Sequence, residues 1–168
     1  MPRSLARFTK SFLRLPQLNE IYRRAESRIH EPGDDETIFE AILETLGSRL
    51  EVSEQDLARI PREGPLLVVA NHPLGGLDGL ALMSLITRGR QDCKLLANSI
   101  LDRFEAFQPW VFSVDVLGEE NAWRKNAFAL KEAARWMRNG GCLAAFPAGQ
   151  VSNWRWSTRC VSDRAWNP

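Results

Sequence analysis

The residue most suited to acid–base chemistry is His72, one of two histidines in the sequence. A neutral imidazole can take a proton near neutral pH, and a carboxylate bound to one ring nitrogen leaves the other free to do so. Asp78 is six positions further on, so on a continuous helix the two side chains would face different directions. Pro73 and the pair Gly75-Gly76 can supply the turn that brings them together. The pattern favours His72 as a general base and Asp78 as its orienting partner.

The residue types of this segment bear on several other interpretations. A nucleotide-binding loop would end in Lys-Ser or Lys-Thr, which is absent, and no Gly-x-Ser-x-Gly nucleophile motif occurs. A metal site would need more ligands than His72 and Asp78, and the other histidine, His30, lies in a distant polar segment. We therefore expect no metal. From spacing alone, an ordinary capped turn with a hydrogen-bonded histidine stays open.

A second polar segment, Phe146 to Ser152, follows an apolar run near the end of the chain. Pro147 and Gly149 can turn the backbone so that its amides face a neighbouring site, which would suit an oxyanion or a substrate phosphate. A plain turn after a strand explains the same residues.

Short apolar runs that alternate with helical patterns must position these two loops. We predict strands at 66–70, 94–97 with its flanks, 111–114 and 142–146, and helices at 77–87 and 119–139. The last helix has Ala127, Leu130, Ala134 and Met137 on one face. The pattern predicts an α/β fold with a central, largely parallel sheet flanked by helices, in which reactive groups gather where strands end.

The N-terminal segment differs from the rest because it is basic, with Arg3, Arg7, Lys10 and Arg14 among its first residues. Apolar residues recur there at helical spacing up to Pro16, which should end or kink the helix. Such a helix can lie on anionic lipid or pack on the domain. A second helical stripe runs from Ile38 to Leu46 before Gly47, and Ser53 is expected to cap a short helix to Ile60. We assign residues 1–60 to an N-terminal helical segment and 61–168 to the core.

Composition narrows the functional classes. A net charge of +1 over 168 residues gives no case for nucleic acid. The three widely spaced cysteines, Cys93, Cys142 and Cys160, fit neither a disulfide framework nor a zinc pattern, which indicates a reducing compartment. No run of about 18 apolar residues occurs, so we expect a soluble or peripheral protein.

Together the two loops resemble the glycerol phosphate and lysophospholipid acyltransferase superfamily, and most of all its hemolysin-like branch, which includes ornithine-lipid acyltransferases. The motifs typical of that branch are similar to Asn-His-Pro-x-Gly-x-Leu-Asp-Gly, then Leu-Ala-Asn, then Phe-Pro-Ala-Gly-Glu-Val-Ser. The corresponding segments here are 71–79, 96–98 and 146–152. The resemblance runs from about Pro16 to the last residue.

The resemblance implies transfer of a fatty acyl group from an acyl carrier protein or coenzyme A thioester to an amine or hydroxyl of a lipid precursor, without a bound cofactor. His72 would be the general base and Asp78 its partner. The other residues that it implies for substrate binding are Asn71, Gly75, Gly76, Arg124, Phe146, Pro147, Gly149 and Gln150. Arg124, beside Lys125 and Asn126, is the candidate for holding a phosphate, with a solvated helix-face arginine as the alternative. The implied location is the cytoplasmic side of the membrane, contacted through the N-terminal basic helix. A catalytically inactive lipid- or acyl-carrier-binding domain is the alternative function.

The sequence departs from the superfamily in two places. The wider superfamily separates its histidine and aspartate by four residues, whereas five lie between His72 and Asp78, as in the branch. The branch's second-loop glutamate is Gln150, which can form hydrogen bonds but cannot hold a cationic amine by charge. The end of the chain resembles a point where family members continue, and Trp154, Trp156 and Trp166 have no later apolar segment to pack against. We therefore expect the domain to be incomplete at its C-terminus.

Overall fold

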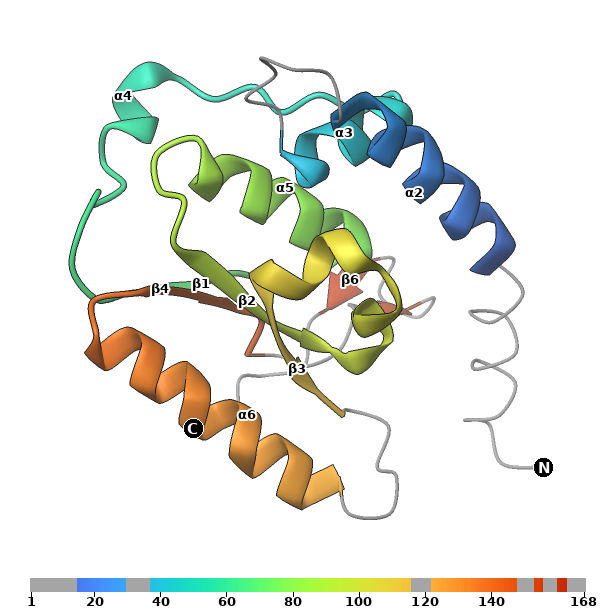
Figure 1. Cartoon of the computed structure of the whole chain (residues 1–168). Helices are drawn as coiled ribbons and strands as arrows, with labels where there is room; N and C mark the ends of the chain where they lie inside the picture. The colour runs from blue at the N-terminus through green and yellow to red at the C-terminus, as the bar shows by residue number, and fades with distance from the viewer. Residues whose placement is uncertain (1–14, 30–36, 116–121, 148–152, 156–159, 163–168) are drawn as a thin grey trace. The chain divides into compact units, whose positions relative to one another are not determined.

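The computed structural model describes residues 15–29, 37–115, 122–147, 153–155 and 160–162 (Figure 1). The chain divides into two compact units, residues 1–49 and 50–168. The first unit contains α2 (Leu15–Ile29) and α3 (Ile38–Thr45). Pro16 lies in the first turn of α2, where its missing N–H leaves no helical hydrogen bond unmade. The basic residues from Arg3 to Arg14 fall outside the described part of the chain.

The helix α3 forms where the apolar stripe predicts it. The Thr37 side chain accepts a hydrogen bond from the Glu40 amide at 3.4 Å and caps the first turn. Gly47, with φ of 69°, follows the helix in a left-handed conformation that suits glycine. Arg28 of α2 forms an ion pair with Glu44 of α3 at 2.7 Å, which joins the two helices of this unit.

The second unit contains a four-stranded sheet in the order β1-β4-β2-β3, and every neighbouring pair is parallel. Its strands are β1 (Leu66–Val69), β2 (Cys93–Asn98), β3 (Val111–Val114) and β4 (Cys142–Ala145). The predicted α/β fold is confirmed, and each predicted strand is found to within one residue at each end. The chain forms β2 and β3 before it returns to β4 beside β1, so the first and last strands of this sheet in the sequence lie side by side.

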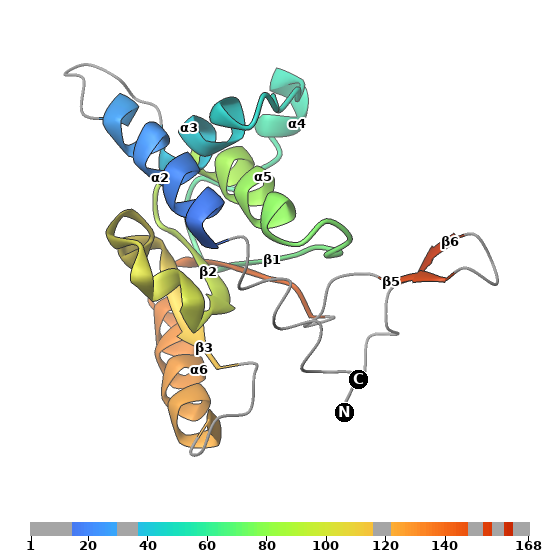
Figure 2. The ribbon, with the colours of Figure 1, turned by 90° about the vertical axis from the view of Figure 1, so that its right-hand side faces the viewer.

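Helices cover the two faces of this sheet. The view in Figure 2 shows α5 (Gly76–Thr87) on one side and α6 (Ala122–Arg138) on the other. The buried residues of the sheet and α5 are mostly apolar, namely Met83, Ile86, Cys93, Leu95, Cys142, Leu143 and Ala144. The unit also contains α4 (Glu54–Leu57), the 3-10 helices η1 (Ser99–Arg103) and η2 (Glu105–Trp110), and an antiparallel pair of strands, β5 (Asn153–Arg155) and β6 (Cys160–Ser162). Ser53 caps α4 as expected, but the helix ends at Leu57 rather than Ile60.

The buried face of α6 differs from the predicted one. Ala129 and Ala133 are buried, whereas Ala127 and Ala134 are exposed and Leu130 is 51% exposed. Two polar side chains account for the difference. Asn126 hydrogen-bonds the backbone at the end of β3, and the Trp136 indole N–H reaches the backbone carbonyls of Asp92 and Cys142, both at 3.1 Å. These bonds turn the Ala129 face toward the sheet and leave the larger apolar side chains outside.

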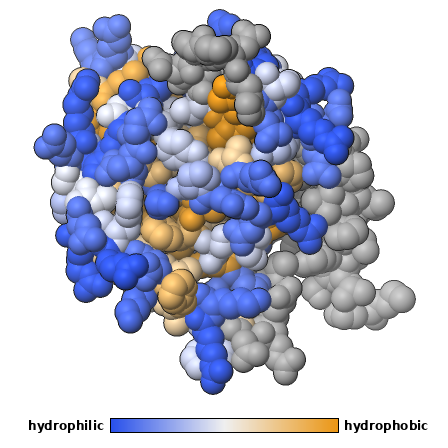
Figure 3. Space-filling view, in the orientation of Figure 1, coloured by the Kyte–Doolittle hydropathy of each residue, from blue (hydrophilic) through white to orange (hydrophobic). Residues whose placement is uncertain are grey.

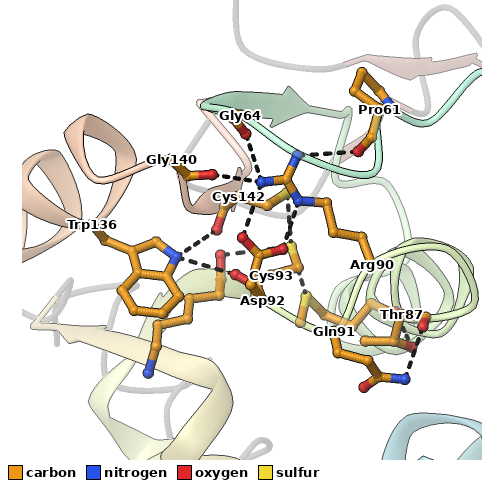
Figure 4. A network of polar contacts seen from close by, with 12 residues as sticks. Pro61, Gly64, Thr87, Arg90, Gln91, Asp92, Cys93, Trp136, Gly140 and Cys142 are labelled. Atoms are coloured by element: carbon orange, nitrogen blue, oxygen red, sulfur yellow. Dashed lines mark hydrogen bonds and ion pairs between the residues drawn. The ribbon is translucent and has the colours of Figure 1, made fainter.

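A buried arginine ties together the amino ends of three strands (Figure 4). The Arg90 guanidinium donates to both carboxylate oxygens of Asp92, at 2.6 and 2.9 Å. It also donates to the carbonyls of Pro61 and Gly64 before β1 and of Gly140 before β4, at 3.1, 2.6 and 2.6 Å. The carboxylate hydrogen bond raises the pKa of Arg90 and lowers the pKa of Asp92. The buried positive charge is tolerated because each of the three guanidinium nitrogens donates to at least one acceptor.

Two thiols lie beside this arginine cluster on neighbouring strands. Cys93 and Cys142 are register partners on β2 and β4, their sulfurs are 3.3 Å apart, and both residues are fully buried. The hydrogen bond between them and burial raise the pKa of the Cys93 thiol far above its ordinary range. Because both side chains are fully buried, the pair packs in the core as small apolar residues do.

The face of the molecule in Figure 3 is mixed, with hydrophilic side chains around smaller apolar areas. Exposed large apolar side chains of the sheet unit include Leu67, Val69, Leu74, Ile100, Trp123, Phe128 and Leu130. Within the described residues, none of the helices combines the length and the apolar character needed to span a bilayer.

Candidate active site

The predicted site lies where β1 and β4 end next to each other. Val69 and Ala145 are register partners, and the Ala70 amide donates to the Ala145 carbonyl at 3.3 Å. The loop that contains His72 leaves β1 at this point, and Phe146 follows β4 directly. The parallel pairing of these two strands therefore brings together two segments that are more than seventy residues apart in the sequence.

Gly75 makes the turn that the His72 loop needs. Its φ of 74° and ψ of −129° belong to a region that residues with a Cβ rarely occupy, and α5 begins at the next residue. The Asp78 amide donates to the Gly75 carbonyl at 3.0 Å, which closes the first turn of the helix. Asp78 is thus held in the first helical turn, where the backbone amides favour a carboxylate.

The turn brings His72 and Asp78 together as predicted. Their side chains are 21% and 16% exposed, and His72 Nδ1 lies 3.4 Å from Asp78 Oδ2. The contact is longer than a good hydrogen bond, and His72 Nδ1 is buried without a hydrogen-bond partner among the described residues. The imidazole is therefore at ion-pair distance from the carboxylate rather than bonded to it. Catalytic hydrogen bonds are often long before substrate binds and shorten afterwards.

The Leu74 amide explains where the carboxylate points. It donates a hydrogen bond to Asp78 Oδ2 at 2.7 Å, so the same oxygen faces both the loop backbone and His72. Sequence reasoning missed this bond. Its signal was the four-residue step from Leu74 to Asp78 across the start of a helix, where acidic side chains commonly accept amides.

Phe146 contacts His72 directly. The two rings are stacked with centroids 4.2 Å apart and planes 25° from parallel. Sequence reasoning assigned Phe146 to substrate binding, whereas the structure places it against the imidazole. Of the other predicted second-loop residues, Pro147 is exposed, and Gly149 and Gln150 fall outside the described part of the chain.

The remaining predicted residues are all exposed, namely Asn71, Gly76 and Arg124. Asn71 is exposed at the start of the loop, and an added Cβ at Gly76 would meet nothing within 4 Å. Arg124 is exposed on α6, with its guanidinium carbon 5.0 Å from the centre of the Trp123 ring. Within the described part of the chain, no hydrogen bond or ion pair joins Arg124 to His72 or Asp78.

Two asparagines, Asn126 and Asn98, have structural partners. The Asn126 side-chain oxygen accepts a hydrogen bond from the Asp115 amide at 2.7 Å, and its NH₂ group donates to the Asp115 carbonyl at 2.8 Å. Asn98, at the end of β2, accepts a hydrogen bond from the Ile100 amide at 2.9 Å and so begins η1. Asn98 belongs to the Leu-Ala-Asn segment, so its place in that motif has a capping explanation.

The described residues contain no group of three or more side chains that could hold a metal ion. The arrangement instead provides one imidazole, one carboxylate and an aromatic ring at the carboxyl edge of a parallel sheet. Such a set can accept a proton from a bound hydroxyl or amine and stabilise the resulting imidazolium.

Comparison with known proteins identifies the family of the chain. An acyltransferase family model matches residues 3–168. The lyso-glycine lipid O-acyltransferase of Bacteroides thetaiotaomicron is 26% identical over 167 residues, covering 99% of this chain and 56% of that protein. The protein of the same name from Phocaeicola vulgatus is 25% identical over 122 residues, or 72% of this chain and 41% of its own length.

The chain therefore spans about half the length of the curated relatives that it matches. No solved structure matches it. The family model covers nearly all of the sequence, including both loops and all four strands of the parallel sheet. The chain belongs to the acyltransferase family.

Proposed function

We propose that this chain transfers a fatty acyl group from a thioester to a lipid precursor, with His72 as general base and Asp78 as its partner. The observation that supports this most is the approach of His72 Nδ1 to Asp78 Oδ2 at 3.4 Å, in a loop that the strand pairing holds beside Phe146. The donor is an acyl carrier protein or coenzyme A thioester, and the acceptor is an amine or hydroxyl of a lipid.

The proposed reaction needs no covalent enzyme intermediate. His72 Nε2 takes the proton of the acceptor as the acceptor oxygen or nitrogen attacks the thioester carbonyl. The new carbon–oxygen or carbon–nitrogen bond forms, the carbon–sulfur bond breaks, and the thiolate leaves with a proton returned from His72. Asp78 holds the Nδ1 side of the ring and stabilises the imidazolium that exists between these steps.

The names of the two relatives support a hydroxyl acceptor, because both are lyso-glycine lipid O-acyltransferases. Gln150 is consistent with this choice, since a hydroxyl acceptor needs no carboxylate to hold a cationic amine. Arg124 is the proposed contact for a phosphate of the donor or acceptor, because it is an exposed cation in the first turn of α6.

The proposed location is the cytoplasmic face of the membrane, with the basic N-terminal segment in contact with anionic lipid. Arg3, Arg7, Lys10 and Arg14 would each contribute about 1 kcal/mol at most to that contact. Neutralising these four residues should weaken binding to anionic vesicles and leave binding to neutral vesicles unchanged. Equal binding by the variant and the parent would exclude this role for the segment.

The test of the proposed reaction is an incubation with a labelled acyl thioester and a total lipid extract. Release of free thiol in step with formation of an acylated lipid supports the proposal, and identifying that lipid names the acceptor. The His72→Ala variant is the control for thiol released without catalysis by this site. Lipid binding without thiol release would indicate an inactive lipid-binding domain instead.

A further inference from the structure

The Phe146 ring stacks on the imidazole of His72, the proposed general base. We infer that Phe146 is a positioning residue, which holds the plane of the His72 imidazole for proton transfer. This inference rests on the proposed function. Its evidence is the stacking itself, with centroids 4.2 Å apart and planes within 25° of parallel, an arrangement that aromatic pairs favour beyond simple burial.

The carboxylate alone leaves the orientation of the ring underdetermined. Rotation about the bond that joins a histidine ring to its Cβ is broad, because this is an sp³–sp² torsion. Asp78 touches the ring at one atom and at 3.4 Å, and its oxygen is already bonded to the Leu74 amide at 2.7 Å. A flat partner against the ring face restricts this rotation in a way that a single contact at the ring edge cannot.

Phe146 can restrict the imidazole because the sheet and α5 hold Phe146 itself. It follows Ala145, whose carbonyl accepts the Ala70 amide at 3.3 Å, so its backbone is fixed relative to the strand that leads to His72. Its ring also packs close to α5, since a Cβ added at Gly79 would lie 3.9 Å from Phe146 Cε2. Thus strand pairing and helix packing, rather than the loop alone, fix the place of the stacking ring.

A positioning role and a substrate-binding role predict different kinetics. A residue that binds substrate equally in the ground and transition states changes KM, whereas one that orients the general base changes kcat. Phe146→Leu removes the ring and keeps an apolar side chain, while Phe146→Tyr keeps the ring. We expect Phe146→Leu to lower kcat by about 10- to 100-fold, as for a small misplacement of a reacting group, with little change in KM. We expect Phe146→Tyr to restore most of the rate.

A matched control separates this effect from general loss of packing. Phe112 lies on β3, which is separated from β4 by β2 in the sheet. Phe112→Leu makes the same chemical change away from the stacked pair, so its kcat should stay within about twofold of the parent, apart from effects on folding that thermal unfolding measures.

Proton NMR provides a readout that does not depend on turnover. The chain has only two histidines, so the signals lost in His72→Gln belong to His72. The face of the Phe146 ring shifts His72 ring protons upfield, and Phe146→Leu should move them downfield while Phe146→Tyr and Phe112→Leu do not.

The outcomes distinguish two failures. A parent that releases no thiol overturns the proposed function and, with it, the role of Phe146. An active parent with an unchanged kcat in Phe146→Leu, or with a raised KM alone, overturns the positioning role and leaves the acyl transfer standing. Unchanged His72 signals in Phe146→Leu would also overturn the inference, because the stacking would then be absent in solution.

Discussion

His72 Nδ1 and Asp78 Oδ2 lie 3.4 Å apart. The same carboxylate oxygen accepts a hydrogen bond from the Leu74 amide at 2.7 Å. The backbone therefore sets the place of the carboxylate whether or not the imidazole is charged. A partner fixed in this way can stabilise the imidazolium and, together with the stacked Phe146 ring, orient the imidazole before substrate arrives.

The first prediction concerns this pair. His72→Ala should lower the rate of thiol release by roughly 100- to 10,000-fold, the usual contribution of a general base. Asp78→Asn should leave more activity, because its amide oxygen can accept the Leu74 amide and face the ring from the place of Oδ2, although it lacks the charge that stabilises the imidazolium. Initial rates with the labelled thioester measure both changes. A folded His72→Ala protein with nearly normal turnover would rule out the mechanism.

The second prediction compares neighbouring glycines. Gly75→Ala should destabilise the protein by about 1–3 kcal/mol, because φ of 74° with ψ of −129° is strained for alanine. Gly76→Ala is the matched control, since its Cβ would meet nothing within 4 Å and alanine favours the helix that starts there. Denaturant unfolding gives both free energies. Equal stability of the two variants would show that the turn can relax.

The third prediction concerns Arg124. If it holds a phosphate, Arg124→Ala should raise the apparent substrate constant on the order of tenfold, the value of one hydrogen bond to a charged group. The effect should persist with water-soluble substrate. Lys131→Ala, at another exposed position of α6, is the control for loss of one positive charge. The same change in both variants would indicate a general charge effect rather than a phosphate site.

The fourth prediction concerns the buried arginine. Arg90→Ala should lower the free energy of unfolding by about 3–5 kcal/mol, because three backbone carbonyls and the Asp92 carboxylate lose their donor together. Arg90→Lys should be intermediate, since a single ammonium cannot reach all these acceptors. Arg62→Ala, at an exposed position, controls for charge. A loss no larger than that of Arg62→Ala would mean that the cluster contributes little to folding.

The fifth prediction concerns acid stability. The hydrogen bond from Arg90 lowers the pKa of Asp92 in the folded protein below its unfolded value of about 3.9. The carboxylate therefore stabilises the fold fully above that pH, and the contribution is lost as the pH falls through the lower folded value. The difference in unfolding free energy between the parent and Asp92→Asn should shrink between pH 7 and about pH 3. A difference that does not change with pH would exclude this linkage.

The sequence predicts the sheet well because its strands are short apolar runs bounded by turns. The runs at 66–69 and 111–114 show this, and the His72 loop is recognisable because glycines mark its turn. The buried face of α6 could not be predicted from apolar spacing, because Asn126 and Trp136 place it through hydrogen bonds to distant backbone groups.

Contacts between residues far apart in the sequence could not be predicted either. Arg90 meets the Gly140 carbonyl fifty residues later, and periodicity has no information on such a distance. The stacking of Phe146 on His72 depends on β1 and β4 being neighbours. An α/β pattern predicts that the strands form a sheet but leaves their order open, so Phe146 could be assigned to the site but not to the imidazole.

The Asn126 side chain has one more consequence for the sheet. Its carbonyl oxygen and its NH₂ group bond the amide and the carbonyl of Asp115, at 2.7 and 2.8 Å. A carboxamide has the same donor and acceptor as a peptide group, so it pairs with the Asp115 backbone as a peptide group would. One helical side chain thus satisfies both backbone groups of the residue that follows β3 and joins α6 to the end of that edge strand.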